Sequence, residues 1–233
     1  MAASCAPAAA TAPWVAIDVG HTLAAPGATS ARGVPEFGFN LALARAVAAA
    51  LGKRGIDARL IGEDGLMPSL PARSLAAQGA ALFVSIHHDS SQPQLMRSWE
   101  VDGTIRPYND DVAGFSLFVS RRGSNPAFSQ ACASLVGAEL VSAGFQRSLY
   151  HAAPIPGEMK PFADRTNGVH FYDNLVVLKT ARQPALLVEA GVIVNRDEEL
   201  RLASPDHVQR QAGALAVGIS RCLKRLKPRQ AQR

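Results

Sequence analysis

Short apolar runs rich in β-branched residues alternate along this chain with longer stretches rich in Ala and Leu. The short runs predict buried strands, and the longer stretches, whose apolar side chains recur at helical spacing, predict helices. Strands that alternate with helices in one chain typically build a sheet covered by helices on both faces. The expected fold is therefore α/β, a single domain with a mixed or mostly parallel sheet flanked by helices on both faces.

The same patterns place the individual elements. Strands are predicted at residues 14–19, 58–61, 82–86, 115–120, 175–178 and 185–189, and helices at residues 36–54, 71–79, 129–143 and 206–226. Two long turn-rich segments, 90–114 and 146–174, interrupt this alternation. Because long loops in a compact domain often bind ligands, we expect the substrate contacts in these segments.

The chain of 233 residues is expected to hold one domain, over residues 14–226, because no linker divides it. Residues 1–13 are almost all Ala, Ser, Pro and Thr, and they lack the basic start and long apolar core of a complete signal peptide. We expect them to be a disordered segment left from a signal sequence. The run from Ala2 to Cys5 is similar to the end of a bacterial lipoprotein signal, which would make Cys5 a site of lipid attachment.

The positive charge of the chain is concentrated at its C-terminal end. The formal net charge is +5, but the residues from Arg221 on carry only cations, so the rest of the chain is close to neutral. Residues 227–233 are expected to be a basic tail, either simply solvated or attracted to an anionic envelope surface, and no nucleic-acid groove is expected. No apolar run approaches the roughly 20 residues that cross a bilayer, so no transmembrane segment is expected.

Three cysteines, Cys5, Cys132 and Cys222, are widely separated in the sequence. An odd number without short spacing predicts neither a disulfide framework nor a cysteine-based metal site. Cys132 lies in an Ala-rich helical stretch, and we expect it to be a small core residue.

Four polar residues stand where predicted strands end or a predicted helix begins. His21 follows the first strand, Glu36 opens the first helix, His87 ends the third strand and Glu189 ends a late strand. The carboxyl ends of strands in an open α/β sheet line one crevice, so residues distant in sequence meet there. Two imidazoles and a carboxylate suit zinc and leave a position for water, and a further carboxylate can act as general base.

Ordinary roles for these residues stay open at this point. A His after a strand is usually a hydrogen-bonded loop residue, and a Glu at a helix start interacts favourably with the helix dipole. Glu189 is less ordinary, because it follows the apolar run Leu186–Val188 and charged side chains are rarely buried without a partner.

Segments 15–21, 36–44, 85–89 and 178–195, in this order and spacing, resemble the zinc-dependent N-acetylmuramoyl-L-alanine amidases that separate daughter cells in bacteria (the amidase-3 catalytic domain). The resemblance covers about residues 14–226. It implies one Zn²⁺ ion held by His21, Glu36 and His87, with Glu189 as the catalytic residue. It also implies hydrolysis of the amide bond between N-acetylmuramic acid and L-alanine in peptidoglycan, by an exported protein of the periplasm or cell envelope. An activator protein is a further candidate partner.

The chain departs from that family's pattern at several positions. Thr22 follows the first histidine, where Gly is usual, and His88 follows His87, where a small residue is usual. His88 is therefore a rival ligand, although successive residues of a strand point to opposite faces and His87 is favoured. Ala190 takes the place of the usual Leu after the catalytic glutamate, which puts the packing behind Glu189 in doubt.

Further roles are expected in the two long segments. Some relatives carry an inhibitory helix whose glutamate plugs the zinc site, and Glu100 and Glu158 are candidates for this, although no clear helix surrounds either. The candidate substrate-binding residues lie in the second segment: Arg165, Asn167, His170, Tyr172 and Asn174. They would bind the acidic peptide stems of peptidoglycan, or else form a surface loop held by its own hydrogen bonds.

Two other functions are compatible with the same residues. One is a zinc amidohydrolase or peptidase that acts on soluble muropeptides, and the other is a non-catalytic relative that binds the envelope. The presence of all four candidate site residues argues against the non-catalytic alternative.

Overall fold

The computed structural model describes residues 13–226. Cys5, with its expected lipid, and the expected basic tail 227–233 lie outside the described residues. The elements follow one another as β1 (Val15–Val19), α1 (Glu36–Gly52), β2 (Ala58–Ile61), α2 (Leu70–Ala76), β3 (Leu82–Asp89), the 3-10 helix η1 (Pro93–Leu95), β4 (Arg97–Val101), β5 (Thr104–Tyr108), β6 (Ser116–Val119), α3 (Pro126–Ser142), the 3-10 helix η2 (Tyr150–Ala152), β7 (Phe162–Asp164), β8 (Val169–Phe171), α4 (Val176–Lys179), β9 (Ala185–Val192), α5 (Arg196–Leu202) and α6 (Pro205–Leu226).

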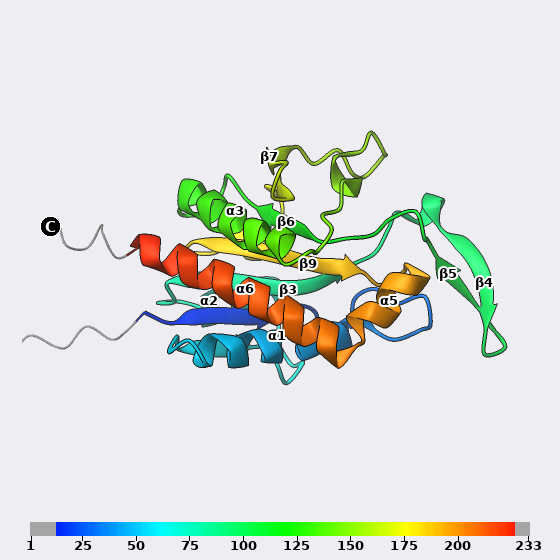
Figure 1. The fold of residues 1–233 in the computed structure, drawn as a ribbon, viewed down its shortest axis with the longest axis horizontal. Coiled ribbons are helices and arrows are strands. Elements are labelled where there is room, and N and C mark those ends of the chain that lie inside the picture. The colour runs from blue at the N-terminus through cyan, green and yellow to red at the C-terminus, as the bar shows by residue number, and fades with distance from the viewer. Residues whose placement is uncertain (1–12, 227–233) are drawn as a thin grey trace, which may run out of the picture.

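Seven strands form one sheet in the order β2-β1-β3-β9-β6-β8-β7 (Figure 1). Strands β2, β1, β3 and β9 run parallel to one another. Strand β6 is antiparallel to β9 and parallel to β8, and β7 is antiparallel to β8. The prediction of a mixed, mostly parallel sheet is confirmed. Because β1, β3 and β9 are neighbours, the residues at their carboxyl ends share one edge of the sheet.

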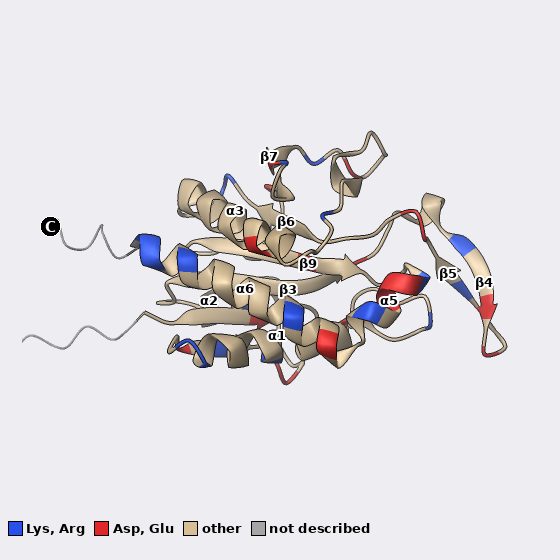
Figure 2. Cartoon of the chain, viewed as in Figure 1, with Lys and Arg blue, Asp and Glu red and all other residues tan. Residues whose placement is uncertain are grey.

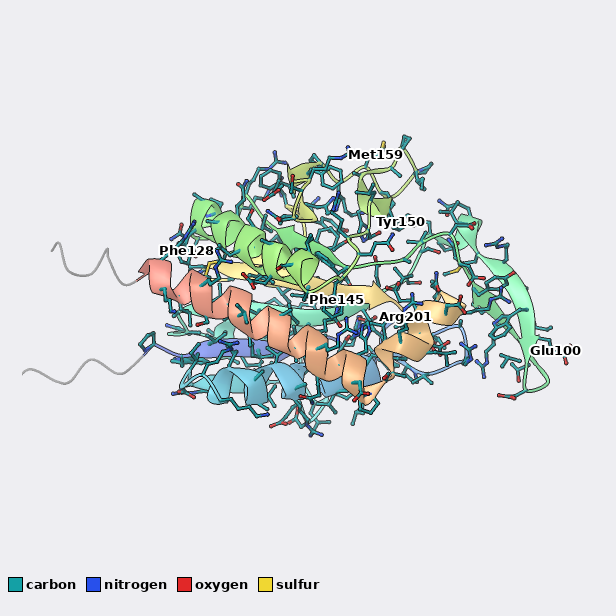
Figure 3. The ribbon with its side chains drawn as sticks, viewed as in Figure 1. Glu100, Phe128, Phe145, Tyr150, Met159 and Arg201 are labelled. Carbon is teal, nitrogen blue, oxygen red and sulfur yellow. A yellow bond between two sulfur atoms is a disulfide. The ribbon has the colours of Figure 1, made fainter. Side chains whose placement is uncertain are left out.

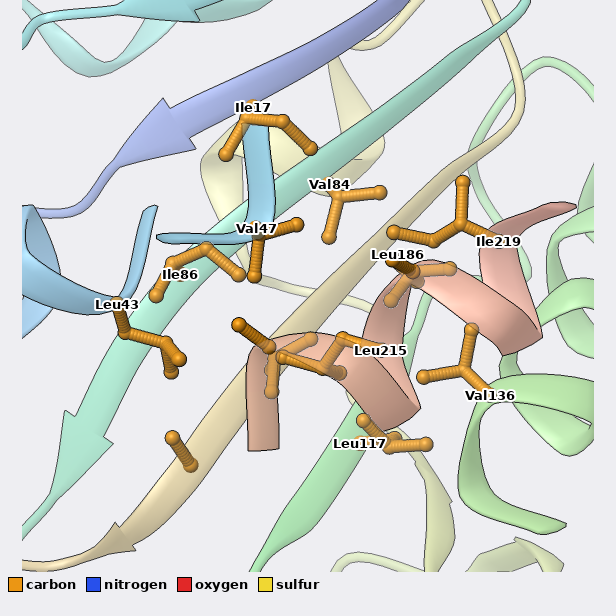
Figure 4. Packing of buried hydrophobic residues seen from close by; sticks show 14 of the residues in the cluster. Ile17, Leu43, Val47, Val84, Ile86, Leu117, Val136, Leu186, Leu215 and Ile219 are labelled. Carbon is orange, nitrogen blue, oxygen red and sulfur yellow. The ribbon is translucent and has the colours of Figure 1, made fainter. Parts of the chain in front are cut away.

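Helices cover both faces of the sheet, as predicted. Helices α1, α3 and α6 pack on one face, and α2 and α4 pack on the other (Figure 1). The larger core lies on the first face, where Ile17, Val84 and Leu186 of three neighbouring strands meet Val47 of α1 and Leu215 of α6 (Figure 4). All five side chains are fully buried, and this packing fixes the strand ends that carry the candidate site residues.

The prediction of a strand at 175–178 is wrong, because residues Val176–Lys179 form the short helix α4. Val177 and Leu178 are buried in the smaller core, and the Thr180 hydroxyl donates a hydrogen bond to the Val176 carbonyl oxygen. A short apolar run packs equally well as a strand or as one helical turn, so its sequence alone does not decide between them.

Helix α5 has no counterpart among the predicted elements, although its start carries a recognisable signal. The Asn195 side chain accepts hydrogen bonds from the backbone N–H groups of Asp197 and Glu198, and three acidic residues occupy the first turn. An Asn cap followed by acidic residues is a typical helix start.

The cysteines do not behave as the sequence analysis predicts. Cys132 of α3 and Cys222 of α6 form a disulfide, with their Cα atoms 5.0 Å apart. Cys132 is buried in the core as expected, but it is covalently linked. The expectation that the chain has no disulfide framework is therefore wrong, because two helices distant in sequence pack side by side and bring these thiols together.

The first long segment forms the β4–β5 hairpin, which extends beyond the sheet (Figure 1). In the second long segment, β7 and β8 join the edge of the sheet. The basic residues from Arg221 to Arg225 continue helix α6, whose last turns carry Lys and Arg (Figure 2), and Arg221 pairs with Glu139 of α3. No helix within residues 13–226 is both long and apolar enough to cross a membrane.

Candidate metal centre

The four candidate site residues lie at the carboxyl edge of the sheet and the adjoining start of α1. His21 lies just beyond β1 with a positive φ of 70°, and Glu36 is the first residue of α1. His87 lies near the end of β3, directly opposite Glu189 in the β3–β9 register. The sheet order therefore brings these distant residues to one place, as expected for the carboxyl ends of neighbouring parallel strands.

His21, Glu36 and His87 form one cluster whose potential ligand atoms all lie within 4.8 Å of one another. The Nε2 atom of His21 lies 2.9 Å from Oε2 of Glu36, and the Nδ1 atom of His87 lies 3.1 Å from Oε1. Two imidazole nitrogens thus face the two oxygens of a single carboxylate. This N/N/O set suits zinc and supplies the three protein ligands typical of a catalytic zinc site.

Neighbouring backbone and side-chain groups hold the carboxylate of Glu36 in one orientation. The backbone N–H of Ala28 donates to Oε2 at 3.0 Å, and the side-chain amide of Asn40 donates to Oε1 at 3.0 Å. Gly27, with a φ of 84°, lies so close that a Cβ atom there would be 2.4 Å from Oε2 of Glu36. A larger residue at position 27 would therefore displace the carboxylate.

The charge state of Glu36 also favours a ligand role. Burial alone would raise the pKa of Glu36, but hydrogen bonds and charge interactions with His21 and His87 lower it below its usual value. Glu36 therefore carries its negative charge at neutral pH and can offer an anionic oxygen to a cation.

His87, and not its rival His88, belongs to this cluster. The His88 ring is buried, its Nδ1 atom lies 2.8 Å from Oδ1 of Asn40, and it packs against Phe39. Burial lowers the pKa of His88 to about 3, so the ring is neutral and held within the core. The two histidines point in different directions, as the alternation of side chains along a strand requires.

Glu189 lies beside the cluster but is not one of its three potential metal ligands. It is partly exposed, and its Oε2 atom is buried without a hydrogen-bond partner among residues 13–226. Burial raises the pKa of Glu189 well above its usual value, and the charges of Asp89 and Glu36 raise it further. A carboxyl group with an unpartnered oxygen and a raised pKa is suited to accept and return a proton.

Arg73 of α2 supports the cluster from behind, and the sequence analysis did not identify it. Its guanidinium donates to Oδ1 of Asp18 at 2.8 Å and to the backbone carbonyl oxygens of Val19 and His21. Ser85 donates to the other oxygen of Asp18 at 2.6 Å. This buried network fixes the end of β1, where the backbone of His21 has its positive φ.

We predict that Arg73→Met destabilises the protein by about 3–5 kcal/mol, because it leaves Asp18 buried without its cation. It should also weaken zinc binding, because the His21 backbone is released. Urea unfolding of the metal-free protein and competition with a zinc chelator measure the two effects.

The control is the double variant Asp18→Asn/Arg73→Met, which removes the buried charge but does not restore the contact to His21. It should recover much of the stability and little of the zinc affinity. Wild-type stability and zinc affinity in Arg73→Met would contradict this role.

A second buried network links the end of β3 to the second long segment. Nε2 of His151 lies 2.6 Å from Oδ2 of Asp89, and Nδ1 lies 2.8 Å from Oε2 of Glu158. Burial alone would lower the pKa of His151, but the two carboxylates raise it to about 9, so the ring is a cation at neutral pH. Lys160 and Gln92 also bind Glu158. His151 is not recognisable from the sequence, because no predicted strand end or helix start marks it.

These contacts also locate the two candidate plugging residues. The carboxylate of Glu158 is held by His151, Lys160 and Gln92. Glu100 is exposed on the β4–β5 hairpin (Figure 3). Neither residue belongs to the cluster of His21, Glu36 and His87.

The five candidate substrate-binding residues contact mainly their own surroundings. Asn167 donates to Asp164, Asn174 accepts from Arg122, and Arg165 stacks on Phe162. His170 is fully buried, and its Nδ1 atom lies 3.2 Å from the carbonyl oxygen of Lys160. Tyr172 is half-buried against Phe118.

The comparisons with known proteins agree with this geometry. The sequence profile of the family Amidase_3, described as N-acetylmuramoyl-L-alanine amidase, matches residues 15–221. The chain is similar to the N-acetylmuramoyl-L-alanine amidase AmiA of Salmonella typhimurium, with 29% identity over 88% of this chain and 74% of that protein. AmiA of Escherichia coli is 28% identical over the same shares.

Solved structures of amidases share the fold. AmiC2 of Nostoc punctiforme aligns with a TM-score of 0.66 and 27% identity, over 91% of this chain and 97% of that chain. The catalytic domain of CwlV from Bacillus (Paenibacillus) polymyxa var. colistinus aligns with a TM-score of 0.69 and 27% identity, over 91% and 99%. Ami1 of Mycobacterium smegmatis, at 21% identity, shows the fold alone, with a TM-score of 0.72 over 91% and 97%. The family profile covers most of the chain, and the chain belongs to the N-acetylmuramoyl-L-alanine amidase family.

Proposed function

We propose that this protein hydrolyses the amide bond between N-acetylmuramic acid and L-alanine in peptidoglycan, with one zinc ion held by His21, Glu36 and His87. The observation that carries the proposal is the convergence of these three side chains within 4.8 Å beside the partner-free Oε2 atom of Glu189. Residues 14–226 are the catalytic domain in this proposal. The cellular role proposed for this reaction is the remodelling of the wall or the separation of daughter cells.

The zinc ion, Glu189 and Glu36 have different roles in the proposed reaction. A bound zinc ion supplies a Lewis acid that lowers the pKa of water and polarises a carbonyl group. Glu189 takes the proton of the attacking water and returns it to the leaving amine of L-alanine, which needs one carboxylate able to work in both directions. Glu36 contributes negative charge, and the contacts of Ala28 and Asn40 keep its oxygens aimed at the cluster.

The location in the cell follows from the disulfide in this proposal. The bond between Cys132 and Cys222 persists in oxidising surroundings such as the bacterial periplasm and is rare in the cytosol. We therefore propose that the protein is exported to the periplasm or cell envelope, with attachment through a lipid on Cys5 as one arrangement. A protein activator is a further proposed partner, since one neighbour in fold, the CwlD amidase from Clostridioides difficile, was solved in complex with the GerS lipoprotein.

The proposal predicts that a chelator abolishes the release of peptide stems from purified peptidoglycan, by at least about 100-fold, and that zinc restores it. The products of the active enzyme are intact glycan strands and peptides with a free N-terminal L-alanine. Mass spectrometry of the released peptides measures both the rate and the bond that is cut.

Two further measurements separate the alternative functions. Comparison of intact sacculi with soluble muropeptides distinguishes a wall amidase from an enzyme of soluble fragments. A zinc-loaded protein that sediments with sacculi but releases nothing from either substrate would be a non-catalytic binder. Unchanged cleavage after complete removal of the metal would contradict the zinc mechanism, provided that circular dichroism shows an intact fold.

A further inference from the structure

A groove with cationic walls lies on the face of the sheet that Glu189 does not face. Two adjoining hollows, of about 870 and 390 Å³, share wall residues at Ala113, Phe145 and Gln146. Figure 3 labels Phe145, Tyr150 and Arg201, which line the groove on the face toward the viewer. Ala190 lines the smaller hollow, and Glu189 projects to the other face because side chains alternate along a strand. The groove is therefore separate from the metal centre.

Three arginines line this groove without forming an ion pair among the described residues. Within residues 13–226, Arg147, Arg201 and Arg210 make no ion pair and no side-chain hydrogen bond. The guanidinium of Arg210 lies 5.5 Å from the centre of the Phe145 ring, and the His207 ring packs edge-on against the same ring at 5.3 Å. Burial lowers the pKa of His207, and the charges of Arg210 and Arg201 lower it further, so both arginines lie near it.

The acidic residues of the groove offset only part of this positive charge, because two of the three are paired with other arginines. Glu198 accepts hydrogen bonds from backbone N–H groups at 3.0 Å and forms no ion pair, although the charge of Arg201 acts to lower its pKa. Asp110 pairs with Arg196 at 2.6 Å, and Asp111 pairs with Arg97 at 3.1 Å. An excess of positive charge around a hollow with an aromatic wall is suited to an anionic ligand.

We propose that this groove binds the free carboxylates of peptide stems in the peptidoglycan network, away from the bond that is being cut. The guanidinium fork matches the geometry of a carboxylate, and peptide stems present carboxylates repeatedly along the polymer. A second contact on a polymeric substrate raises the effective concentration at the first site without changing the chemistry there. The inference rests on the proposed peptidoglycan substrate, and it predicts a function specific to the intact polymer.

The first test compares Arg201→Ala/Arg210→Ala with the matched control Lys53→Ala/Arg54→Ala, which removes two exposed cations near the end of α1. The groove variant should cleave intact sacculi about fivefold less efficiently at low substrate concentration, since exposed charge contacts contribute modestly. It should cleave soluble muropeptides at the wild-type rate, because the proposed second contact is made on the polymer. The control should match the wild type on both substrates.

The second test identifies the ligand chemistry. Sacculi free of teichoic acid are treated with carbodiimide and ammonium, which converts stem carboxylates to amides. Sedimentation is measured in a Glu189→Gln background, so that the wall is not digested. Untreated sacculi should bind the Glu189→Gln protein about fivefold more tightly than the same protein with Arg201→Ala/Arg210→Ala. Amidated sacculi should bind both proteins equally.

The outcomes separate the inference from the proposed function. If the wild type cleaves neither substrate, the proposed function itself fails. If the wild type cleaves both and the groove variant equals it on sacculi, or loses activity on both substrates alike, the inference is overturned. If the groove variant and the control variant Lys53→Ala/Arg54→Ala lose binding to sacculi equally, the loss reflects net charge alone. That result would also overturn the inference.

Discussion

Glu189→Gln is expected to bind one zinc ion as tightly as the wild type and to release peptide stems about 10³-fold more slowly. Glutamine has nearly the same shape but cannot take a proton from water at neutral pH. The variant should fold normally, because burial already raises the pKa of Glu189 and a neutral side chain suits that environment. Elemental analysis of the purified protein and the turnover rate on soluble muropeptides measure the two quantities.

His21→Ala is the matched contrast, because it removes a proposed ligand and not the proposed base. It should lose the zinc itself and, with it, activity, whereas Glu189→Gln loses activity with zinc in place. A Glu189→Gln protein that keeps a rate near that of the wild type would exclude Glu189 as the base. A zinc-free Glu189→Gln protein would instead make Glu189 part of the metal site.

Much of the fold could be predicted because its central strands are buried on both faces and therefore appear as continuous apolar runs. This holds for β1, β3 and β9, which lie inside the sheet and are almost entirely buried. It fails for β7 and β8, which have three residues each and lie at the edge of the sheet within a turn-rich segment. For strands this short, hydrogen bonding to a neighbour decides the structure more than local sequence does.

The candidate site residues could be predicted from the sequence, but the residues that hold them in position could not. His21, His87 and Glu189 stand where the sequence predicts strand ends, and the topology of an open sheet gives a physical reason for their meeting, although β3 and β9 continue to Asp89 and Val192. Arg73 lies inside a short helix and His151 in the 3-10 helix η2, so nothing in their local sequence indicates that they reach Asp18 and Asp89. Contacts of this kind depend on how the helices and loops pack on the sheet, which a single sequence does not specify.

The pairing of Cys132 with Cys222 contradicts the expectation from the sequence, and its removal is expected to have a large effect on stability. The bond closes a loop across a sequence separation of 90 residues and links α3 to α6. In the chain-entropy account, a cross-link of this span stabilises the folded state by about 4–5 kcal/mol, because it restricts the unfolded chain. Both cysteines belong to the core on the face of α1, α3 and α6 and contribute no atom to the cluster of candidate metal ligands.

We therefore expect Cys132→Ala/Cys222→Ala to unfold at a temperature lower by on the order of 10 °C, and to keep the wild-type turnover rate at temperatures where it stays folded. Calorimetry and activity assays on the same preparation measure both.

The wild type unfolded in the presence of a reductant is the control, since it loses the cross-link but keeps both sulfur atoms in the core. If reduction reproduces most of the loss, the stabilisation comes from the covalent link. Equal unfolding temperatures for the oxidised and reduced wild type would show that the bond contributes nothing to stability, and would remove the physical reason for expecting this fold to depend on an oxidising compartment.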